Sequence, residues 1–341
     1  MGSDVVHEHC QRLMSTAISE GEKARIVSPP NPWVGAIVET QAGNFAGHTQ
    51  APGESHAEMD ALIKAGRNAA GSTMYVTLEP CAHQGRTPPC AEKIVEAGIK
   101  RVVIGIVDPD QRVRGRGIEY LQKKGVEVIV GVCADEIKTQ LAPYLKQRST
   151  GTPWVVLKLA VTLDGRIAAN DGSSNWITGE IARERVQQIR LASQAIVVGA
   201  NTIRVDDSSL RARIPDAKRQ PIRVVLGSIP EAASVHPAEE FHGSGSDLVR
   251  SLGQREVLQV LIEGGSQVAK EFLDLDLVDQ FVFHIAPAVH GGSDGISAFA
   301  GKGALSVGQL IRLSTKSVTQ LGGDTEIILW SKRAEAFIES L

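Results

Sequence analysis

The sequence has few cysteines and few aromatic residues, and each shortage excludes a class of protein. Four cysteines in 341 residues are too few for a fold held together by disulfides. Aromatic residues make up only 4% of the chain, so stacking platforms for single-stranded nucleic acid are not evident. No apolar run approaches the roughly 20 residues that are needed to span a bilayer.

An excess of charge of one sign is also lacking. The chain has 36 Lys and Arg residues against 39 Asp and Glu residues, a formal net charge of −3. A protein that coats phosphates is normally basic, so we expect no nucleic-acid partner. Residues 1–12 are polar and lack the apolar core of a secretion signal. We therefore predict a cytoplasmic protein with no membrane association.

The chain does have enough apolar residues to form two ordinary cores. Hydrophobic residues make up 42% of its 341 residues, and domains typically have about 100–200 residues. Residues 145–153 (LKQRSTGTP) are polar and contain Gly and Pro, which indicates a linker. We predict one domain over residues 1–147 and a second over residues 153–341.

Both halves alternate strand-like and helix-like segments, which predicts an α/β fold with helices covering each sheet. In the first half we expect strands at 36–38, 74–78, 101–107 and 126–130, and helices at 56–67, 90–97 and 117–124. In the second half we expect strands at 154–160, 195–199, 222–226, 257–262 and 280–285, a helix at 181–192, and a connection at 241–253 that runs into a short helix.

One His and two Cys in the first half have the chemistry of a zinc site. His56, Cys81 and Cys90 supply three ligands of the kind that Zn²⁺ prefers, and the fourth position remains for water. Glu58 is not needed as a ligand, so it can take a proton from the bound water and return it to a leaving amine. Each residue taken singly could equally be a helix cap or an inert buried thiol, but the combination favours a catalytic metal site.

The order of these residues points to deamination. A His-x-Glu segment followed by Pro-Cys and a second Cys is the signature of zinc nucleobase deaminases. That signature has two residues between the cysteines, whereas eight separate them here. Helices starting at His56 and Cys90 would place both ligands near positive dipole ends, which favours the thiolate. Cys10 and Cys133 lack such neighbours, so we interpret them as structural.

Three segments together resemble the deaminase domain of riboflavin biosynthesis, in which the longer cysteine spacing is normal. They are residues 31–35 (NPWVG), 53–58 (GESHAE) and 80–90 (PCAHQGRTPPC). The resemblance implies a cytidine-deaminase-like domain with Zn²⁺ on His56, Cys81 and Cys90, and with Glu58 as the proton shuttle. It also implies a pocket for a phosphoribosylated pyrimidine, lined by Asn31, His48, His83 and Arg86. Arg86 suits a phosphate, although a solvated loop arginine would look the same.

The second half carries weaker evidence of its own. Gly265 and Ser266 enter a helix after a β-branched strand, so their backbone N–H groups could meet a phosphate. No G-x-G-x-x-G motif occurs there, so a Rossmann domain is not supported. A helix cap or a turn would account for the glycines equally well.

Five blocks of the second half resemble the reductase half of the bifunctional riboflavin-biosynthesis enzymes, which has a dihydrofolate-reductase-like fold and uses NADPH. They are residues 158–165 (KLAVTLDG), 175–179 (NWITG), 198–202 (VGANT), 205–207 (VDD) and 263–265 (EGG). The resemblance implies NADPH contacts at Ala160, Trp176, Thr178, Thr202, Asp206, Gly265 and Ser266. It implies substrate contacts at Ser174, Arg190, Leu210, Arg213 and Glu263, of which the two arginines suit the ribose phosphate. For Lys158 and Asp207 a site role and a buried ion pair both remain open.

The chain departs from the family pattern at three places. The usual Asp-Pro-Asn-Pro is Asp-Pro-Asp-Gln at residues 108–111, and the usual Asp-Asp-Pro is Asp-Asp-Ser at residues 206–208. The interval 225–257 is shorter than is normal for the family, with one strand–helix unit apparently missing. The activity of the reductase half therefore stays open at this point.

The resemblance implies a bifunctional enzyme. Its first domain would hydrolyse the 2-amino group of 2,5-diamino-6-ribosylamino-4(3H)-pyrimidinone 5′-phosphate, and its second would reduce the ribosyl chain to ribityl with NADPH. Symmetric homo-oligomers are the default for such enzymes. The alternatives are a monofunctional zinc deaminase with an inactive reductase-like domain, a related deaminase–reductase of a specialised pathway, and a zinc-dependent binding or scaffold protein.

Overall fold

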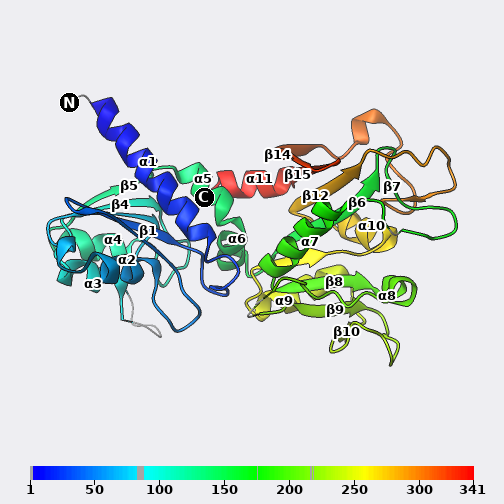
Figure 1. Cartoon of the computed structure of the whole chain (residues 1–341), viewed down its shortest axis with the longest axis horizontal. Helices are drawn as coiled ribbons and strands as arrows, with labels where there is room; N and C mark the ends of the chain where they lie inside the picture. Colours follow the sequence, from blue (N-terminus) through cyan, green and yellow to red (C-terminus); the bar gives the residue numbers. More distant parts are fainter. Residues whose placement is uncertain (1–2, 83–87, 175, 216, 218) are drawn as a thin grey trace. The chain divides into compact units, whose positions relative to one another are not determined.

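The chain folds into two compact units, Met1–Thr150 and Gly151–Leu341. The computed structural model describes residues 3–82, 88–174, 176–215, 217 and 219–341 (Figure 1). The boundary between the units falls inside the segment that we predict to be a linker. In that described part of the chain, no helix has both the length and the apolar character needed to cross a membrane.

The first unit is a five-stranded sheet covered by helices. Its strands have the order β2-β1-β3-β4-β5, with β1 antiparallel to β2 and β3, and β3, β4 and β5 parallel. The elements are α1 (Ser3–Glu22), β1 (Gly35–Thr40), β2 (Gly43–His48), α2 (Ala57–Ala65), the 3₁₀ turn η1 (Gly66–Ala69), β3 (Thr73–Leu78), α3 (Cys90–Glu96), β4 (Arg101–Ile106), α4 (Arg116–Lys123), β5 (Glu127–Val130), α5 (Ala134–Gln140) and α6 (Ala142–Thr150).

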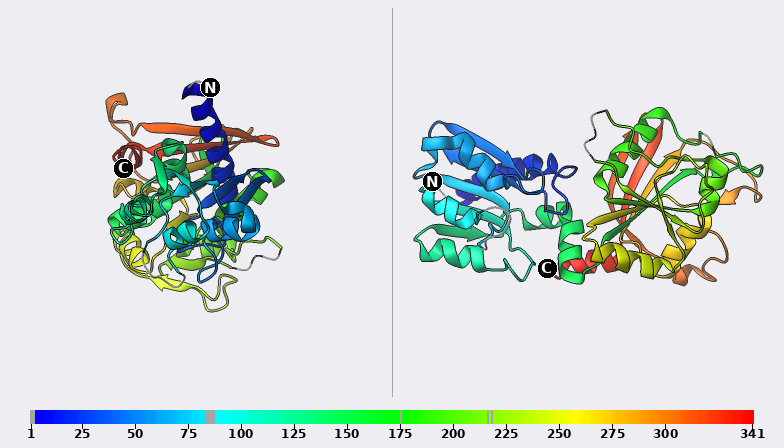
Figure 2. Two further views of the ribbon diagram at one scale, coloured as in Figure 1. Left: turned by 90° about the vertical axis from the view of Figure 1, so that its left-hand side faces the viewer. Right: turned by 90° about the horizontal axis from the view of Figure 1, so that it is seen from below.

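Two glycines show why helices can pack so closely on this sheet. A Cβ atom on Gly35 of β1 would lie 1.8 Å from the carbonyl oxygen of Ala17 in α1, and one on Gly47 of β2 would lie 2.4 Å from backbone atoms of α2. Gly47 pairs with Ala36, the neighbour of Gly35, and successive strand residues face opposite sides. Helices α1 and α2 therefore cover opposite faces of the sheet, as Figure 2 shows.

The predicted linker is partly wrong, because α6 continues to Thr150. Two apolar side chains hold this helix to the first unit. Leu145 is fully buried, and the buried Tyr144 donates its hydroxyl to the carboxylate of Asp108 at 3.0 Å. The composition of the segment predicts a linker because most of its residues after Leu145 are polar. The two buried residues that hold the helix in place stand at its start and do not change that composition. The chain leaves the helix at Gly151, whose φ of 72° is left-handed.

The second unit is built on an eight-stranded sheet with the order β10-β9-β8-β11-β6-β12-β15-β14. In this order the six strands from β10 to β12 run parallel to one another. Strand β15 runs antiparallel to both of its neighbours, β12 and β14. The elements are β6 (Trp154–Thr162), β7 (Arg166–Ala168), α7 (Glu180–Ala192), β8 (Ala195–Gly199), α8 (Ala200–Asp206), β9 (Ile222–Leu226), β10 (Glu239–Phe241), α9 (Gly245–Gln254), β11 (Gln259–Ile262), α10 (Ser266–Asp274), β12 (Gln280–Ala286), β13 (Ile296–Ser297), the 3₁₀ turn η2 (Val307–Gln309), β14 (Leu313–Leu321), β15 (Asp324–Ser331) and α11 (Lys332–Glu339).

The core of the second unit lies between one face of this sheet and helices α9 and α10. Alternate residues of β6, from Val155 to Val161, pack there against Leu248 and Leu252 of α9 and Phe272 of α10. The intervening residues of β6 face the other side, over which α7 lies (Figure 1). On β6 this second face carries Lys158 as well as the buried apolar residues Trp154 and Val156.

The short interval between β9 and β11 still contains a strand and a helix. Strand β10 adds to the parallel sheet beside β9, and α9 starts with a capping box in which Ser244 and Asp247 satisfy each other's backbone N–H groups. The sequence pattern predicts the helix but not β10, which is only three residues long.

Candidate functional sites

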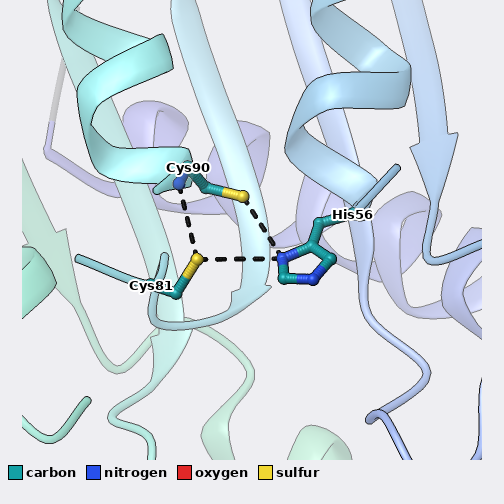
Figure 3. Close-up of side chains that lie close together, drawn as sticks. All are labelled: His56, Cys81 and Cys90. Carbon is teal, nitrogen blue, oxygen red and sulfur yellow. Dashed lines mark hydrogen bonds between the residues drawn. The ribbon is translucent and has the colours of Figure 1, made fainter. Parts of the chain in front are cut away.

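The structure brings His56, Cys81 and Cys90 together in the first unit (Figure 3). Their ligand atoms lie within 4.8 Å of one another, and His56 Nδ1 is 3.4 Å from Cys90 Sγ and 3.8 Å from Cys81 Sγ. Tetrahedral zinc would separate a bound nitrogen and sulfur by about 3.6 Å, so the three donors fit this ion. As the sequence predicts, His56 is the residue that precedes α2 and Cys90 is the first residue of α3.

Local hydrogen bonding prepares Cys81 to be a ligand. Contacts with the Cys90 thiol, with His56 and with the Cys90 backbone N–H lower the pKa of Cys81 to about 4, and outweigh the effect of burial. Cys81 is therefore a thiolate at neutral pH, the form that binds metal.

Glu58 lies on the first turn of α2 and is almost completely buried. Burial raises its pKa to about 7, even though His56 opposes the shift. A carboxyl that titrates near neutral pH can both accept and return a proton, which is the requirement for a proton shuttle.

A buried carboxylate next to the zinc loop, Glu79, organises the loop in a way that no local sequence pattern predicts. Glu79 directly precedes Pro80-Cys81 and accepts hydrogen bonds from four backbone N–H groups at 2.9–3.3 Å. The four donors belong to the loop after β4 and the start of α4: Asp108, Gly115, Gly117 and Ile118. Gly117 also approaches so closely that a Cβ atom there would lie 1.9 Å from the Pro80 oxygen. Glu79 thus ties the segment that carries Cys81 to α4.

Of the predicted pocket residues of this unit, two are described. Asn31 lies in the loop between α1 and β1 and donates its N–H to the Ser28 carbonyl. His48 ends β2, where its ring nitrogen is 2.8 Å from Glu20 and its backbone N–H donates to Asp60 of α2. His48 is thereby attached to the helix that carries Glu58. His83 and Arg86 lie outside the described residues.

The second unit contains a cavity of about 1020 Å³ at the carboxyl ends of its parallel strands. Helices α8 and α10 both begin at its wall, and each has a glycine as its N-cap; α8 follows β8 directly, and α10 follows β11 after three residues. The positive ends of both helices therefore face the cavity, an arrangement that suits an anionic ligand. Gly264 is needed for this packing, since a Cβ atom there would lie 2.5 Å from Val268.

Most of the predicted reductase residues line this cavity. They are Ala160, Ser174, Thr202, Asp206, Glu263, Gly265 and Ser266. The other five lie outside the lining. Trp176 is 68% exposed and has the Arg183 guanidinium 4.4 Å from its ring centre, Thr178 is buried at the start of α7, and Arg213 is exposed. Leu210 is buried and has a φ of 53°. Arg190 does not line the cavity itself but donates a hydrogen bond to Glu263, which does.

Arg190 and Glu263, both predicted to contact substrate, contact each other in this structure. The Arg190 guanidinium donates to both Glu263 oxygens at 2.5–3.2 Å and to the Arg211 carbonyl at 3.2 Å. Burial alone would raise the pKa of Glu263, but the nearby Arg190 and Lys158 charges lower it. Glu263 is therefore ionised at the cavity wall.

Lys158 also lines the cavity, which favours a site role over the structural interpretation. Lys158 and Ala160 share the α7 face of β6 with His284 and Glu326 of the neighbouring strands. His284 is fully buried and lies 3.0 Å from Glu326, which accepts from Arg185 at 3.1 Å. A layer of charged and polar side chains therefore lies between α7 and the sheet, in which burial lowers the pKa of His284 and so favours its neutral form. Asp207 instead anchors a turn, because it accepts from the N–H and hydroxyl of Ser234.

Comparison with known proteins relates both units to one family. The cytidine and deoxycytidylate deaminase zinc-binding region matches residues 7–106, and the RibD C-terminal domain matches residues 153–327. The second match includes the short interval at 225–257, so a reductase-like domain that has lost its function is not favoured. The fold expected from the sequence, a cytidine-deaminase-like domain followed by a dihydrofolate-reductase-like domain, is confirmed.

Relatives of full length show the same relationship. The chain is 37% identical to the riboflavin biosynthesis protein RibD of Bacillus amyloliquefaciens, over 92% of this chain and 94% of that protein. The solved structure of Acinetobacter baumannii RibD is 34% identical, with a TM-score of 0.89 over 96% of this chain and 99% of that one. A diaminohydroxyphosphoribosylaminopyrimidine deaminase/5-amino-6-(5-phosphoribosylamino)uracil reductase from Thermotoga maritima is 32% identical, with a TM-score of 0.86 over 95% and 99% of the two chains. The chain belongs to the RibD family, the bifunctional zinc deaminases and NADPH-dependent reductases of riboflavin biosynthesis.

Proposed function

We propose that the first unit removes the 2-amino group of 2,5-diamino-6-ribosylamino-4(3H)-pyrimidinone 5′-phosphate by hydrolysis. The observation that carries this assignment is the meeting of His56, Cys81 and Cys90 beside the buried Glu58. Zinc held by these three residues would lower the pKa of a bound water and so supply the nucleophile at neutral pH. Three protein ligands leave the fourth position free for this purpose.

Glu58 performs the proton transfers. With a pKa near 7, it accepts a proton from the attacking water and delivers it to the departing amine. Its near-complete burial keeps the carboxylate out of bulk water. Asn31, His48, His83 and Arg86 are the residues that we assign to binding the pyrimidine and its ribose phosphate.

We further propose that the second unit reduces the ribosyl chain of the deaminated product to a ribityl chain. NADPH supplies the hydride, and the protein orients the two reactants in the cavity. The N-termini of α8 and α10, with Thr202, Asp206, Gly265 and Ser266, would hold the cofactor, together with Ala160, Trp176 and Thr178. Ser174, Arg190, Leu210, Arg213 and Glu263 are assigned to the substrate.

The setting of the enzyme is also a proposal. We propose a cytoplasmic enzyme that acts on a small molecule, and the formal net charge of −3 supports the lack of a nucleic-acid partner. The enzyme would act as a homo-oligomer, the usual state of such enzymes.

Mass spectrometry of the products tests both reactions in one experiment. The zinc-loaded protein is incubated with the diaminopyrimidinone ribosyl phosphate, with and without NADPH. We expect an amine-to-carbonyl mass change without the cofactor and a further gain of two hydrogens with it. The carbonyl change alone in both samples would contradict the reductase assignment, and an unchanged substrate would contradict the deaminase assignment.

A further inference from the structure

Helix α7 begins without a cap of its own. Its N-cap is Gly179, which has no side chain to accept a hydrogen bond, and the third residue of the helix, Ala182, cannot complete a capping box. The N–H of Gly179 instead donates to Asp324 Oδ2 at 2.7 Å, across a separation of 145 residues. A carboxylate of β15 therefore supplies the missing cap, at the positive end of the helix dipole.

Asp324 is buried to an extent that is unusual for a carboxylate. Its exposed fraction is 4%, and within the residues that the structure describes its side chain accepts one hydrogen bond, the bond from Gly179. The burial of a charge costs free energy that a single bond offsets only in part. Helix α9 of the same unit begins with a local capping box, so a helix here can start without a buried acid. The burial of Asp324 therefore points to a role beyond stability.

The carboxylate holds the end of a segment that forms one wall of the reductase cavity. Residues 176–179 (WITG), which we name the entry segment, lead directly into α7. Ile177 lines the cavity, and its neighbours Trp176 and Thr178 are two of the residues that we assign to NADPH. Because the hydrogen bond is made by the last residue of the entry segment, it fixes where these three side chains lie.

Arg183 contacts the entry segment from the first turn of α7. Its guanidinium donates to the Thr178 carbonyl at 2.8 Å and lies 4.4 Å from the centre of the Trp176 ring. This cation–π contact favours one orientation of a ring that is 68% exposed and accessible to a ligand. The position of the helix is therefore passed on to the Trp176 ring.

A second carboxylate of β15 keeps α7 in place along the sheet. Glu326 shares a face of β15 with Asp324, accepts from Arg185 of α7 at 3.1 Å and contacts the buried His284 at 3.0 Å. Burial alone would raise the pKa of Glu326, but hydrogen bonding to His284 and the Arg185 charge lower it. Glu326 is therefore ionised, and β15 contacts α7 at two successive places.

We propose that Asp324 is a positioning residue for NADPH, because its bond to Gly179 holds the entry segment where Trp176 and Thr178 meet the cofactor. The inference rests on the proposed reductase function and names a group that prepares its cofactor site. Without the bond, the segment is in its binding position for only part of the time, and the apparent Kd for NADPH rises by the inverse of that fraction. Asp324 does not line the cavity, so kcat at saturating NADPH should be unchanged.

Titration of the full-length protein with NADPH tests this role without a catalytic assay. Binding is followed by energy transfer to NADPH from tryptophan, and Trp176 is the one exposed tryptophan of the four in the chain. For Asp324→Ala we expect an apparent Kd about 5- to 10-fold higher, the usual effect of losing a helix cap. Asp324→Asn should recover most of the affinity, because its side-chain oxygen accepts the same N–H.

The matched control is Asp247→Ala. It removes the equivalent bond to the N-cap of α9, a helix that does not line the cavity, so it should bind NADPH like the wild type. Steady-state kinetics should show the same division, with a raised KM for NADPH and an unchanged kcat in Asp324→Ala alone. Hydrogen exchange without NADPH should be faster over residues 176–185 in Asp324→Ala, whereas β6 should stay protected because the unit has folded.

Several results would overturn the inference. Asp324→Ala could bind NADPH as tightly as the wild type, Asp247→Ala could weaken binding equally, or Asp324→Asn could be no better than the alanine variant. A wild type that does not bind NADPH overturns the proposed reduction as well. If Asp324→Ala does not fold, Gly179→Ala disturbs the same bond, because its Cβ would lie 3.2 Å from the buried Asp324 Oδ2. It should also raise the Kd, and an unaltered value contradicts the role of Asp324.

Discussion

At the scale of single residues, Glu58 shows how burial produces a catalytic group. Burial raises the pKa of its carboxyl to about 7, because the surrounding core removes the group from water, and the nearby Cys81 thiolate adds a smaller upward effect. The sequence places Glu58 correctly beside the metal ligands, since the His-x-Glu spacing is local. The extent of its burial depends on long-range packing, which spacing does not reveal.

Replacing Glu58 with Gln should abolish deamination without releasing zinc. The amide cannot carry the proton, so we expect the rate to fall by about 10²–10⁴-fold. Zinc content measured by atomic absorption should equal that of the wild type, because Glu58 is not a ligand. A variant that deaminates at a normal rate would contradict the assignment, and reduction by the same sample is the control for folding.

Arg213→Ala tests the assigned phosphate contact in the second unit. Arg213 is exposed and makes no ion pair in the described chain, so its loss should leave stability unchanged. We expect the KM of the ribose phosphate to rise about 10- to 100-fold, the usual effect of losing a charge-assisted hydrogen bond. Steady-state kinetics measure this, and an unaltered KM would place Arg213 outside the substrate site.

Asp108→Asn should alter how stability depends on pH. Burial raises the pKa of Asp108 to about 6, whereas an unfolded Asp titrates near 3.9. Between these values the folded state holds a proton that the unfolded state has lost, so stability falls as pH rises from about 4 to about 6. The loss is up to about 3 kcal/mol at roughly 1.4 kcal/mol per unit. Denaturant titrations across this range should show a flatter profile for the variant, and an equally steep one would refute this origin.

At the scale of elements, the segment that carries Cys81 is held by contacts between the ends of two neighbouring strands, β3 and β4. Glu79 attaches the segment before Cys81 to the start of α4 through four hydrogen bonds, and Gly117 allows the close approach. Such outer contacts orient the ligands themselves.

Glu79→Gln should therefore weaken zinc binding. A glutamine oxygen can accept only part of these bonds, and its NH₂ group would face N–H donors. We expect zinc to dissociate about 10-fold faster in a chelator-competition assay, in keeping with other outer contacts of metal ligands. Glu127→Gln, at an exposed ion pair of β5 with Arg101, is the control and should retain zinc normally. Equal dissociation rates for both variants would show that Glu79 does not position Cys81.

The sequence predicts elements well where periodicity is strong and fails where pairing is non-local. The strands and helices from β3 to β5, together with β6, α7 and β8, begin and end within a few residues of the expected positions, whereas the short strand β7 is not expected from the sequence. Strand β14, rich in Ser and Thr, has no clear alternation because it lies at an edge, and the sequence analysis expects no strand there. The contacts of Glu79 and the pair His284–Glu326 join segments far apart in the chain, which no local pattern reveals.

At the scale of the whole molecule, the two reactions are chemically separable. All three zinc ligands belong to the first unit, and the cavity assigned to NADPH is lined entirely by the second. Treatment with a chelator should stop deamination completely while the deaminated compound is still reduced at the normal rate. Consumption of NADPH, followed by its absorbance, measures this, and restored zinc should recover the first reaction. Simultaneous loss of both activities would mean that zinc supports the second unit as well.

The position of β6 has a consequence for the synthesis of the chain. This strand is the first of the second unit, yet it pairs with β11 (residues 259–262) and β12 (residues 280–286). Both partner strands are therefore synthesised long after β6. The sheet of the first unit is complete at Val130, so that unit can fold during translation while β6, an apolar strand, waits without a partner. Pairing over such a distance is slow, and the waiting strand is prone to aggregate. Slower translation beyond residue 162 should therefore lower the yield of soluble protein more than slower translation before it.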